Sequence, residues 1–342
     1  MKTTTIEQLW LELESEARAG TSGAWISRFA LPESGNRLLV AIETSTNRRA
    51  VLLPLPSGTL PARRDWPHCR GLEVFALSIN GVPNLGVRLN DDQFSDVFGT
   101  LAEDVARRVS NVPDDAAAAA AFVDRLRRWQ KFLAARSASI SVPEQRGLFG
   151  ELLVMRNHVL REFGPEIAVR SWRAPQASHQ DFQFPSASIE VKTTTEKQPQ
   201  AVRITSERQL DGTGSGALFL IVVILDEREI EVSDEAMPGE SLPDIVADLR
   251  ERTTGAPRLD FDDRLLDLGY LDAEAPRLSS RRFTLRNELA FRVHDSFPRI
   301  LERELPMGVG NVSYDLSLAA CQPFLTTADH MMSVVSGRRS DP

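Results

Sequence analysis

Apolar residues in the first third of the chain recur in short runs that turn-forming residues separate. The pattern predicts a helix at 6–17 and a second helix at 91–109. Between these helices, alternating apolar runs predict strands at 24–29, 37–43, 50–53, 72–78 and 85–89. The segments 33–36 and 79–81 carry the residues that β-hairpin turns require. We therefore expect residues 1–112 to form an α+β unit that serves protein interaction or DNA positioning.

Helical periodicity takes over after residue 113. One apolar face is formed by Phe122, Leu126, Trp129 and Leu133, and a second helix begins near Pro143. The buried stripe of that second helix is predicted to consist of Leu148, Leu152, Met155 and Val159. Glu151 falls at the edge of this stripe, between the small surfaces of Gly147 and Gly150.

The run 217–225 is uniformly apolar, which is typical of a central strand that is covered on both faces. Downstream, the pattern predicts a strand at 230–232, a helix at 243–252, a mixed segment at 283–301 and a strand at 312–318, with the last dozen residues frayed. We expect a core at 113–235 and a C-terminal α+β extension at 236–342 that packs on it.

Composition narrows the class of protein. The chain has 342 residues, 42% hydrophobic and 26% charged, and no apolar run approaches the ~20 residues of a membrane helix. Cys69 and Cys321 match no metal-binding spacing, which favours reduced thiols in a cytoplasmic protein. The net charge of −8 argues against tight, unaided DNA binding, although local basic patches decide that question.

The chemistry concentrates between residues 178 and 195. Side chains alternate along a strand, so Glu190 and Lys192 share one face while Val191 points to the other. A hairpin that turns at Pro185 would bring Asp181 close to Glu190. Two carboxylates beside an ammonium can hold Mg²⁺ (or Mn²⁺) and position a water molecule for attack on a phosphodiester.

The arrangement D-x8-E-V-K of Asp181, Glu190 and Lys192 resembles the PD-(D/E)XK nuclease superfamily, with Gln180 in place of the proline. The preceding G-L-F-G-E-L resembles the helix that carries an extra metal-site glutamate in many of these nucleases. With Ile204-x-Ser206-x-x-Gln209-Leu210, these segments resemble a bacterial family of PD-(D/E)XK motif proteins (formerly a domain of unknown function) found in restriction and phage-defence gene clusters. The resemblance is strongest over residues 120–225.

The resemblance implies an α/β fold with a restriction-endonuclease-like mixed sheet of αβββαβ order, which places a helix within 203–210. It also implies a Mg²⁺-dependent DNA endonuclease. Asp181, Glu190 and the Val191 carbonyl would hold the metal ion, and Glu151 would hold a second ion or its water. Lys192 would orient the attacking water or stabilise the transition state. Expected partners are DNA, an ATPase or helicase, and a methyltransferase. The chain itself has no GxxxxGK[ST] motif.

Further candidates are less specific. His179 shares a face with Asp181 and, like Arg203, Arg208 and Gln209, is a candidate contact to DNA phosphate. Each also has an ordinary interpretation: a packed or exposed histidine, solvated arginines, and a glutamine that caps its own segment.

Three alternatives stay open. The charged triad is also compatible with an exposed strand edge, where glutamate and lysine discourage aggregation. The chain is compatible with a catalytically silent, DNA-binding or scaffolding member of the same kind of system. RNA as the substrate is a further possibility, because the hairpin chemistry is indifferent to the sugar.

Overall fold

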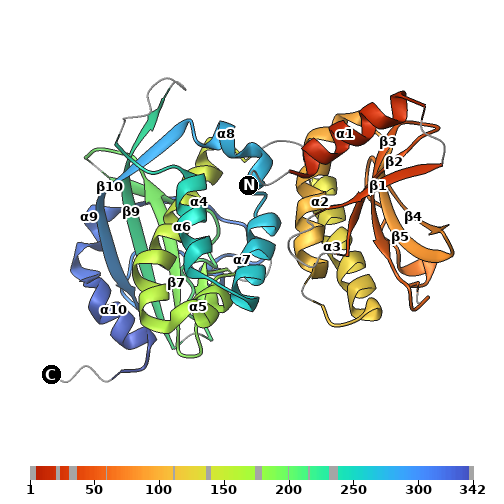
Figure 1. The fold of residues 1–342 in the computed structure, drawn as a ribbon. Coiled ribbons are helices and arrows are strands. Elements are labelled where there is room, and N and C mark those ends of the chain that lie inside the picture. Colours follow the sequence, from red (N-terminus) through yellow and green to blue (C-terminus); the bar gives the residue numbers. More distant parts are fainter. Residues whose placement is uncertain are drawn as a thin grey trace. The chain divides into compact units, whose positions relative to one another are not determined.

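The computed structural model describes residues 5–20, 24–30, 37–58, 60–110, 112–135, 140–173, 179–198, 200–214, 216–230 and 238–338. The chain divides into two compact units, Met1–Ala138 with Leu271–Ala273, and Ser139–Tyr270 with Glu274–Pro342 (Figure 1). This division differs from the predicted boundaries after residues 112 and 235. The helix at 115–135 belongs to the first unit, and the C-terminal segment belongs to the same unit as the candidate site. No helix in these described ranges is long and apolar enough to cross a membrane.

The first unit is an antiparallel sheet of strand order β1-β2-β3-β5-β4 with helices on one face (Figure 1). Its elements are α1 (Ile6–Arg18), β1 (Trp25–Phe29), β2 (Leu39–Glu43), β3 (Arg48–Pro54), β4 (Leu72–Ile79), β5 (Val82–Leu89), α2 (Ser95–Ser110) and α3 (Asp115–Ala135). The helices and strands predicted for this region are therefore present.

Local chemistry explains these elements. Asn80 and Gly81 have φ angles of 50° and 81°, which is the left-handed turn geometry that joins β4 to β5. The predicted turn at 33–36 lies outside the described residues. Trp10 of α1 stacks on Phe98 of α2 with ring centroids 5.2 Å apart, so the two helices share the core above the sheet.

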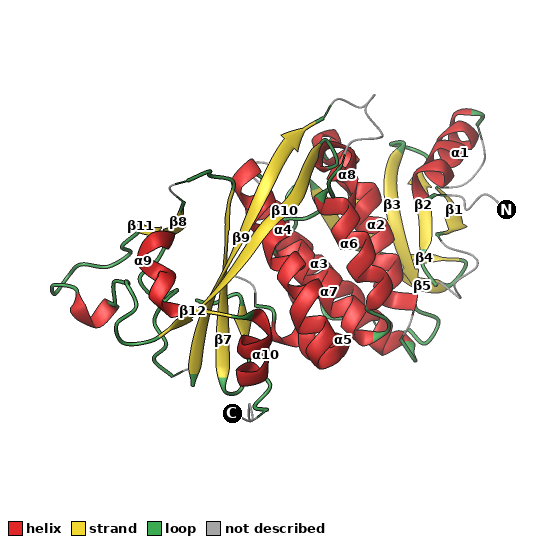
Figure 2. Ribbon diagram, turned by 90° about the vertical axis from the view of Figure 1, so that its left-hand side faces the viewer, coloured by secondary structure: helices red, strands yellow, loops and turns green. Residues whose placement is uncertain are grey.

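The second unit contains a mixed sheet of order β12-β10-β9-β7-β6 and a separate pair, β11-β8. Its helices are α4 (Val142–Val154), a π-helical turn (Met155–Val159), α5 (Leu160–Ser171), α6 (Leu242–Arg252), α7 (Ala256–Asp267), α8 (Ala275–Leu278), α9 (Leu318–Cys321) and α10 (Ala328–Val335). Its strands are β6 (Phe182–Gln183), β7 (Ala187–Thr194), β8 (Ala201–Ile204), β9 (Ala217–Glu229), β10 (Arg281–Val293), β11 (Tyr314–Ser317) and β12 (Leu325–Thr326). Figure 2 shows β9 and β10 as the longest strands of this sheet.

Strand β9 is the centre of the sheet, as its apolar sequence predicted. It pairs in parallel with β7 and antiparallel with β10. Phe219, Ile221 and Val223 join the core under the helices, whereas Leu220 and Val222 join a second core on the opposite face. Both faces of the strand are therefore buried.

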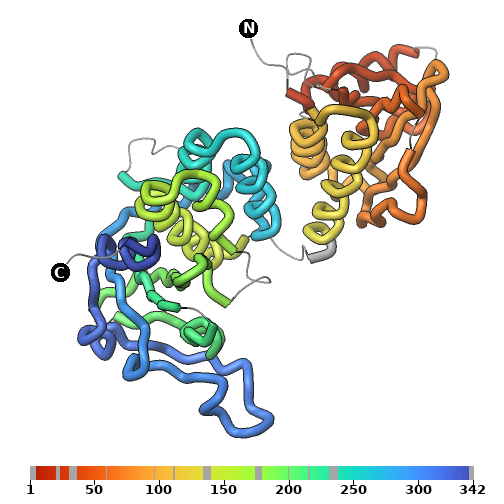
Figure 3. The backbone as a smooth tube through the Cα atoms, turned by 90° about the horizontal axis from the view of Figure 1, so that it is seen from below, coloured from red at the N-terminus to blue at the C-terminus, as the bar shows by residue number. Residues whose placement is uncertain are grey.

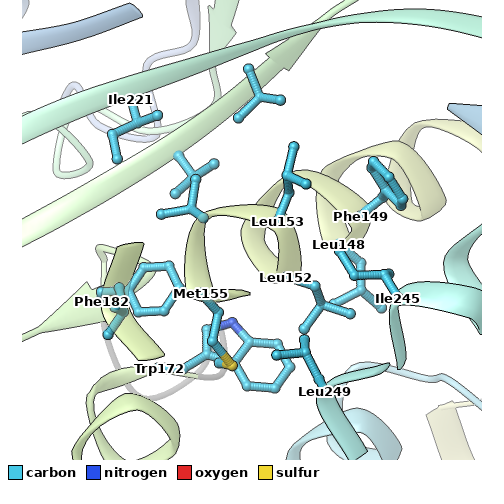
Figure 4. Packing of buried hydrophobic residues seen from close by; sticks show 14 of the residues in the cluster. Leu148, Phe149, Leu152, Leu153, Met155, Trp172, Phe182, Ile221, Ile245 and Leu249 are labelled. Atoms are coloured by element: carbon cyan, nitrogen blue, oxygen red, sulfur yellow. The ribbon is translucent and has the colours of Figure 1, made fainter. Parts of the chain in front are cut away.

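Helix α4 packs on β7, and α4 and the π-helical turn that continues it together carry the predicted apolar stripe. Leu148, Leu152, Met155 and Val159 are at most 5% exposed. Figure 4 shows Leu152 and Met155 beside Trp172, with Leu249 of α6 opposite. The stripe thus fixes the rotation of α4 about its axis, and with it the direction in which Glu151 projects.

Three expectations about this unit differ from the structure. The helix expected within 203–210 is absent: Ala201–Ile204 is strand β8, and residues 207–210 form a turn. Buried Val202 and Ile204 alternate with exposed Arg203, which is the two-residue period of a strand. Moreover, β8 pairs with β11 outside the main sheet, and Figure 2 labels the two strands side by side. Figure 3 follows the backbone from the green part of the chain near residue 200 to the blue part near residue 315. The αβββαβ core is therefore not confirmed.

The second difference lies at the C-terminus, where α10 is a regular helix rather than a frayed end. Its Met331, Met332 and Val335 are buried in the helical core, and Thr327 caps its first turn. The third is the length of β9, because the predicted strand at 217–225 continues to Glu229. Residues 231–232 of the strand predicted at 230–232 lie outside the described residues. Helix α7 was not predicted.

Substitution of Gly150 by alanine is expected to destabilise the second unit by about 1–3 kcal/mol, the usual cost of overpacking. A Cβ atom at Gly150 would lie 2.2 Å from Cγ2 of Thr193 on β7. Gly147, on the same helix, has open space at the equivalent position, so Gly147→Ala is the matched control and should be neutral or stabilising.

Equilibrium denaturation of both variants checks this prediction. The double variant Gly150→Ala/Thr193→Ala should recover part of the lost stability, because it removes the atom with which the new Cβ collides. Equal stability of the two single variants would contradict the close contact of α4 with β7.

Candidate active site

The predicted hairpin forms from β6 and β7. Phe182 pairs with Ile189 and Gln183 with Ser188, so continuation of this register sets Asp181 opposite Glu190. Asp181 directly precedes β6, and its Oδ2 accepts a hydrogen bond of 2.7 Å from the Val191 backbone N–H. This bond holds the Asp181 carboxylate at the edge of β7, beside the residues with which it was predicted to act.

Glu190 and Lys192 lie on the same face of β7, as strand alternation predicted. Glu190 is fully buried, and Lys192 Nζ lies 2.6 Å from its Oε1 in an ion pair. Apart from Lys192, no group among the described residues donates a hydrogen bond to either carboxylate oxygen of Glu190. A buried carboxylate with a single ammonium as its partner keeps most of its acceptor sites unfilled, which is costly, and such exceptions occur where a cation or a catalytic role accounts for them.

Glu151 reaches this cluster from helix α4. Its Oε2 accepts a 2.7 Å hydrogen bond from the indole Nε1 of Trp172. The negative charges of Asp181 and Glu190 both act on it, which shows that the three carboxyl groups lie within electrostatic range of one another. The side chain therefore projects into the cluster rather than into bulk solvent.

Burial dominates the electrostatics of the cluster. Burial raises the pKa of Glu190 to about 8, with a further contribution from the charge of Asp181 and an opposing one from Lys192. Burial and the neighbouring carboxylates raise the pKa of Glu151 well above its usual range, and burial raises that of Asp181. For Lys192, burial lowers the pKa, but Glu190 and Asp181 more than offset this, so its net pKa is raised and the ammonium stays protonated.

The stability of the metal-free protein is expected to fall as the pH rises from about 4.5 to about 8. In this window the unfolded chain releases the Glu190 proton first, whereas the folded chain still holds it, so deprotonation favours unfolding. This loss of folding stability is absent below the pKa of Glu190 in the unfolded chain and complete above its pKa in the folded chain. One unit of pKa corresponds to about 1.4 kcal/mol, so the loss amounts to a few kcal/mol.

Urea denaturation with a chelator present, at about pH 5 and about pH 9, measures this loss. The Glu190→Gln variant has no titrating group at this position and should show a flatter profile. A profile as steep as that of the wild-type chain would assign the pH dependence to other groups.

The carboxylates of this cluster can supply oxygen donors to a metal ion. Across the described ranges, no three histidine, cysteine or acidic side chains converge closely enough to hold a metal ion as they stand. The carboxylate oxygens of Glu190 and of Asp181 are hard donors of the kind that Mg²⁺ and Mn²⁺ prefer. The residues thus fit a divalent cation that would replace Lys192 as the neighbour of Glu190.

The arginines and the glutamine that were predicted to contact phosphate bond to partners outside this cluster. Arg203 pairs with Asp315 at 3.1 Å, and Arg208 pairs with Glu302 at 2.6 Å. Gln209 accepts a 2.9 Å hydrogen bond from the Thr205 backbone N–H, so it closes its own turn rather than a helix. His179 is exposed and lies two residues before Asp181.

Two positioning residues were missed by sequence reasoning. Trp172 holds Glu151, although nothing in its local sequence marks this role. Gln180, which replaces the motif proline, is buried and donates from Nε2 to the carbonyl oxygens of Arg208 at 2.9 Å and Gln209 at 3.3 Å. Gln180 therefore ties the residue before Asp181 to the turn that precedes β9, a contact that proline could not make.

The chain belongs to a protein family whose description reads "Putative PD-(D/E)XK family member (DUF4420)", and the match covers residues 6–319. No curated protein and no solved structure matched the chain. The family assignment agrees with the resemblance noted in Asp181, Glu190 and Lys192, and it extends through nearly all of both units.

Proposed function

We propose that this PD-(D/E)XK family member is a divalent-metal-dependent DNA endonuclease whose site is formed by Asp181, Glu190, Lys192 and Glu151. One observation carries the proposal: on one hairpin, a fully buried glutamate whose only partner among the described residues is a lysine lies opposite an edge aspartate. The stability of a β-hairpin does not require buried charges in this arrangement, whereas cation binding and phosphodiester hydrolysis do require them.

Asp181 and Glu190 would hold Mg²⁺ or Mn²⁺ together with the Val191 carbonyl. The Val191 N–H points to Asp181, and the N–H and C=O of one strand residue lie on the same edge of the strand, so its carbonyl also faces the aspartate. The bound ion would polarise the phosphate and lower the pKa of the attacking water.

Lys192 supplies a fixed positive charge. The charges of Glu190 and Asp181 raise its pKa above the ordinary value of a lysine, so at neutral pH it is protonated, donates hydrogen bonds and does not act as a base. We assign it to the attacking water and to the negative charge that develops on the phosphate. With a cation on the carboxylates, Lys192 would be paired less tightly with Glu190, and its ammonium would be free for this task.

Glu151 would bind a second ion or a water molecule. Trp172 fixes one of its oxygens, which leaves the other for this role. Because its pKa is raised by burial and by two nearby carboxylates, the group also stands ready to hold a proton when no second cation is present.

A catalytically silent, DNA-binding subunit is the second candidate. The ion pair of Lys192 with Glu190 favours it, because the pair neutralises a ligand that the metal needs. The presence of all three motif residues favours the enzyme, since loss of one would be the simplest route to a silent protein.

We further propose that the chain acts in a bacterial restriction or phage-defence system, with an ATPase or helicase and a methyltransferase as partners. The support is the resemblance to proteins of such gene clusters and the net charge of −8, which suits a chain that meets DNA beside a more basic partner.

Cleavage of supercoiled plasmid DNA tests the proposal. The purified chain, alone and with the products of its neighbouring genes, should nick or linearise plasmid with Mg²⁺ or Mn²⁺ and should not do so with a chelator. DNA binding without cleavage under every metal and partner condition would favour the silent subunit. Cleavage of RNA but not of DNA would reassign the substrate.

A further inference from the structure

A basic hollow of about 750 Å³ lies where strands β7 and β9 end and β10 begins. Five basic side chains line it against two carboxylates, and none of the candidate active-site residues does. The basic residues are Arg146, Lys197, Arg228, Arg281 and Arg286. This local excess of positive charge contrasts with the net charge of −8 of the whole chain, and such local concentration is the electrostatic mark of a site for polyanions.

The positive charge is only partly neutralised within the hollow. Glu227 pairs with both Arg146 and Arg281, and Asp226 pairs with Arg286 at 3.4 Å. Lys197 and Arg228 are exposed and form no ion pair with any carboxylate that the structure describes. These two side chains are therefore available to an anionic ligand without loss of an internal contact.

A β-bulge builds one wall of the hollow. The pairing of β9 with β10 shifts register between Leu285 and Asn287, which turns Arg286 out of the ladder. Its Nη2 donates to the carbonyl oxygens of Thr195 at 3.2 Å and Leu225 at 3.1 Å. The guanidinium thus ties the end of β7 to β9, so the hollow is anchored to the strand that carries Glu190 and Lys192.

The length of β7 sets the distance between the candidate active site and the basic hollow. Thr195 lies five residues beyond Glu190, which spans roughly 17 Å at about 3.3 Å per strand residue. One DNA strand advances about 3.4 Å along the duplex axis per nucleotide, so the same length corresponds to about five nucleotides. The hollow is thus within reach of the duplex whose phosphodiester occupies the active site.

We infer that the basic hollow binds backbone phosphate of the duplex DNA substrate several nucleotides from the cleaved bond, with Lys197 and Arg228 as direct contacts. The inference rests on the proposed function for the identity of the substrate. A phosphate group of a free nucleotide has the same chemistry, and the experiment separates the two sources.

The test is the salt dependence of duplex binding, measured by fluorescence anisotropy in the presence of a chelator so that no cleavage occurs. Each phosphate contact contributes about 0.9 to the slope of log K against log salt, so Lys197→Gln/Arg228→Gln should lower the slope by about 1.8. Arg161→Gln/Arg170→Gln, which removes two exposed charges of helix α5, is the matched control and should leave the slope unchanged.

An unchanged slope in the hollow variant, or equal losses in both variants, would overturn the inference. So would failure of the wild-type chain to bind duplex at low salt. ATP that binds the wild-type chain but not the hollow variant, with duplex binding equal in both, would assign the hollow to free nucleotides and also overturn it. Binding is measured without metal, so this test does not depend on cleavage. If the hollow variant lowers the salt slope but the wild-type chain never cuts DNA, the hollow remains a DNA-binding site and only the proposed nuclease activity is rejected.

Discussion

The Glu190→Gln variant is expected to lose Mn²⁺ binding and DNA cleavage together, with cleavage reduced by about 10³ or more, since several kcal/mol of charge stabilisation is removed. The substitution keeps the volume of the side chain and removes only its charge. Among the described residues, Glu190 is the one candidate ligand that is fully buried, and Lys192 is the one partner of its carboxylate, so both oxygens can turn to a cation.

Calorimetric Mn²⁺ titration beside a single-turnover cleavage assay measures both losses. The metal-free variant should be at least as stable as the wild-type chain near pH 8, because a neutral amide in this position costs less than a buried carboxylate. Undiminished Mn²⁺ affinity in Glu190→Gln would remove this residue from the metal site.

The Lys192→Met variant is expected to separate the two properties. Its Mn²⁺ affinity should be equal to or higher than that of the wild-type chain, because a positive charge 2.6 Å from Glu190 Oε1 is removed. Cleavage should nevertheless fall by about 10²–10³, the usual cost of deleting one preorganised charge that acts in the transition state. Methionine keeps the apolar stem of the side chain, so the packing loss is small.

Lys131→Met, a substitution of an exposed lysine in helix α3, is the control for general effects of charge. Without metal and above about pH 8, where Glu190 is ionised in the folded chain, Lys192→Met should be less stable than wild type, because the buried carboxylate loses its counter-ion, and Mn²⁺ should restore the stability. A parallel loss of metal binding and cleavage in this variant would make Lys192 a structural partner of Glu190 rather than a catalytic residue.

Much of the hairpin could be predicted from the sequence because strand alternation is a local rule. The two-residue period put Glu190 and Lys192 on one face and Val191 on the other, and the turn at Pro185 set the register with Asp181. Helix α4 was predictable for the same reason, since its apolar stripe has a regular period and places Glu151 at its edge.

The remainder depends on contacts between distant segments. The partner of β8 is β11, which follows it by more than a hundred residues, so no local pattern revealed that β8 leaves the main sheet. The buried roles of Gln180 and Trp172 rest on hydrogen bonds across 28 and 21 residues. Helix α3 belongs to the first unit, where it packs on α2, and its own periodicity could not specify this partner.

The most direct test of the nuclease site compares the single-turnover plasmid cleavage of three chains: wild type, Glu190→Gln and Glu288→Gln. Glu288 is a half-buried glutamate of β10 that pairs with His158 at 2.6 Å, so it controls for the loss of a carboxylate from the same sheet. Wild type and Glu288→Gln should cut DNA with Mn²⁺, with whatever partner the reaction requires, and Glu190→Gln should not. Cleavage by Glu190→Gln at the wild-type rate would contradict the assignment of this hairpin as the active site.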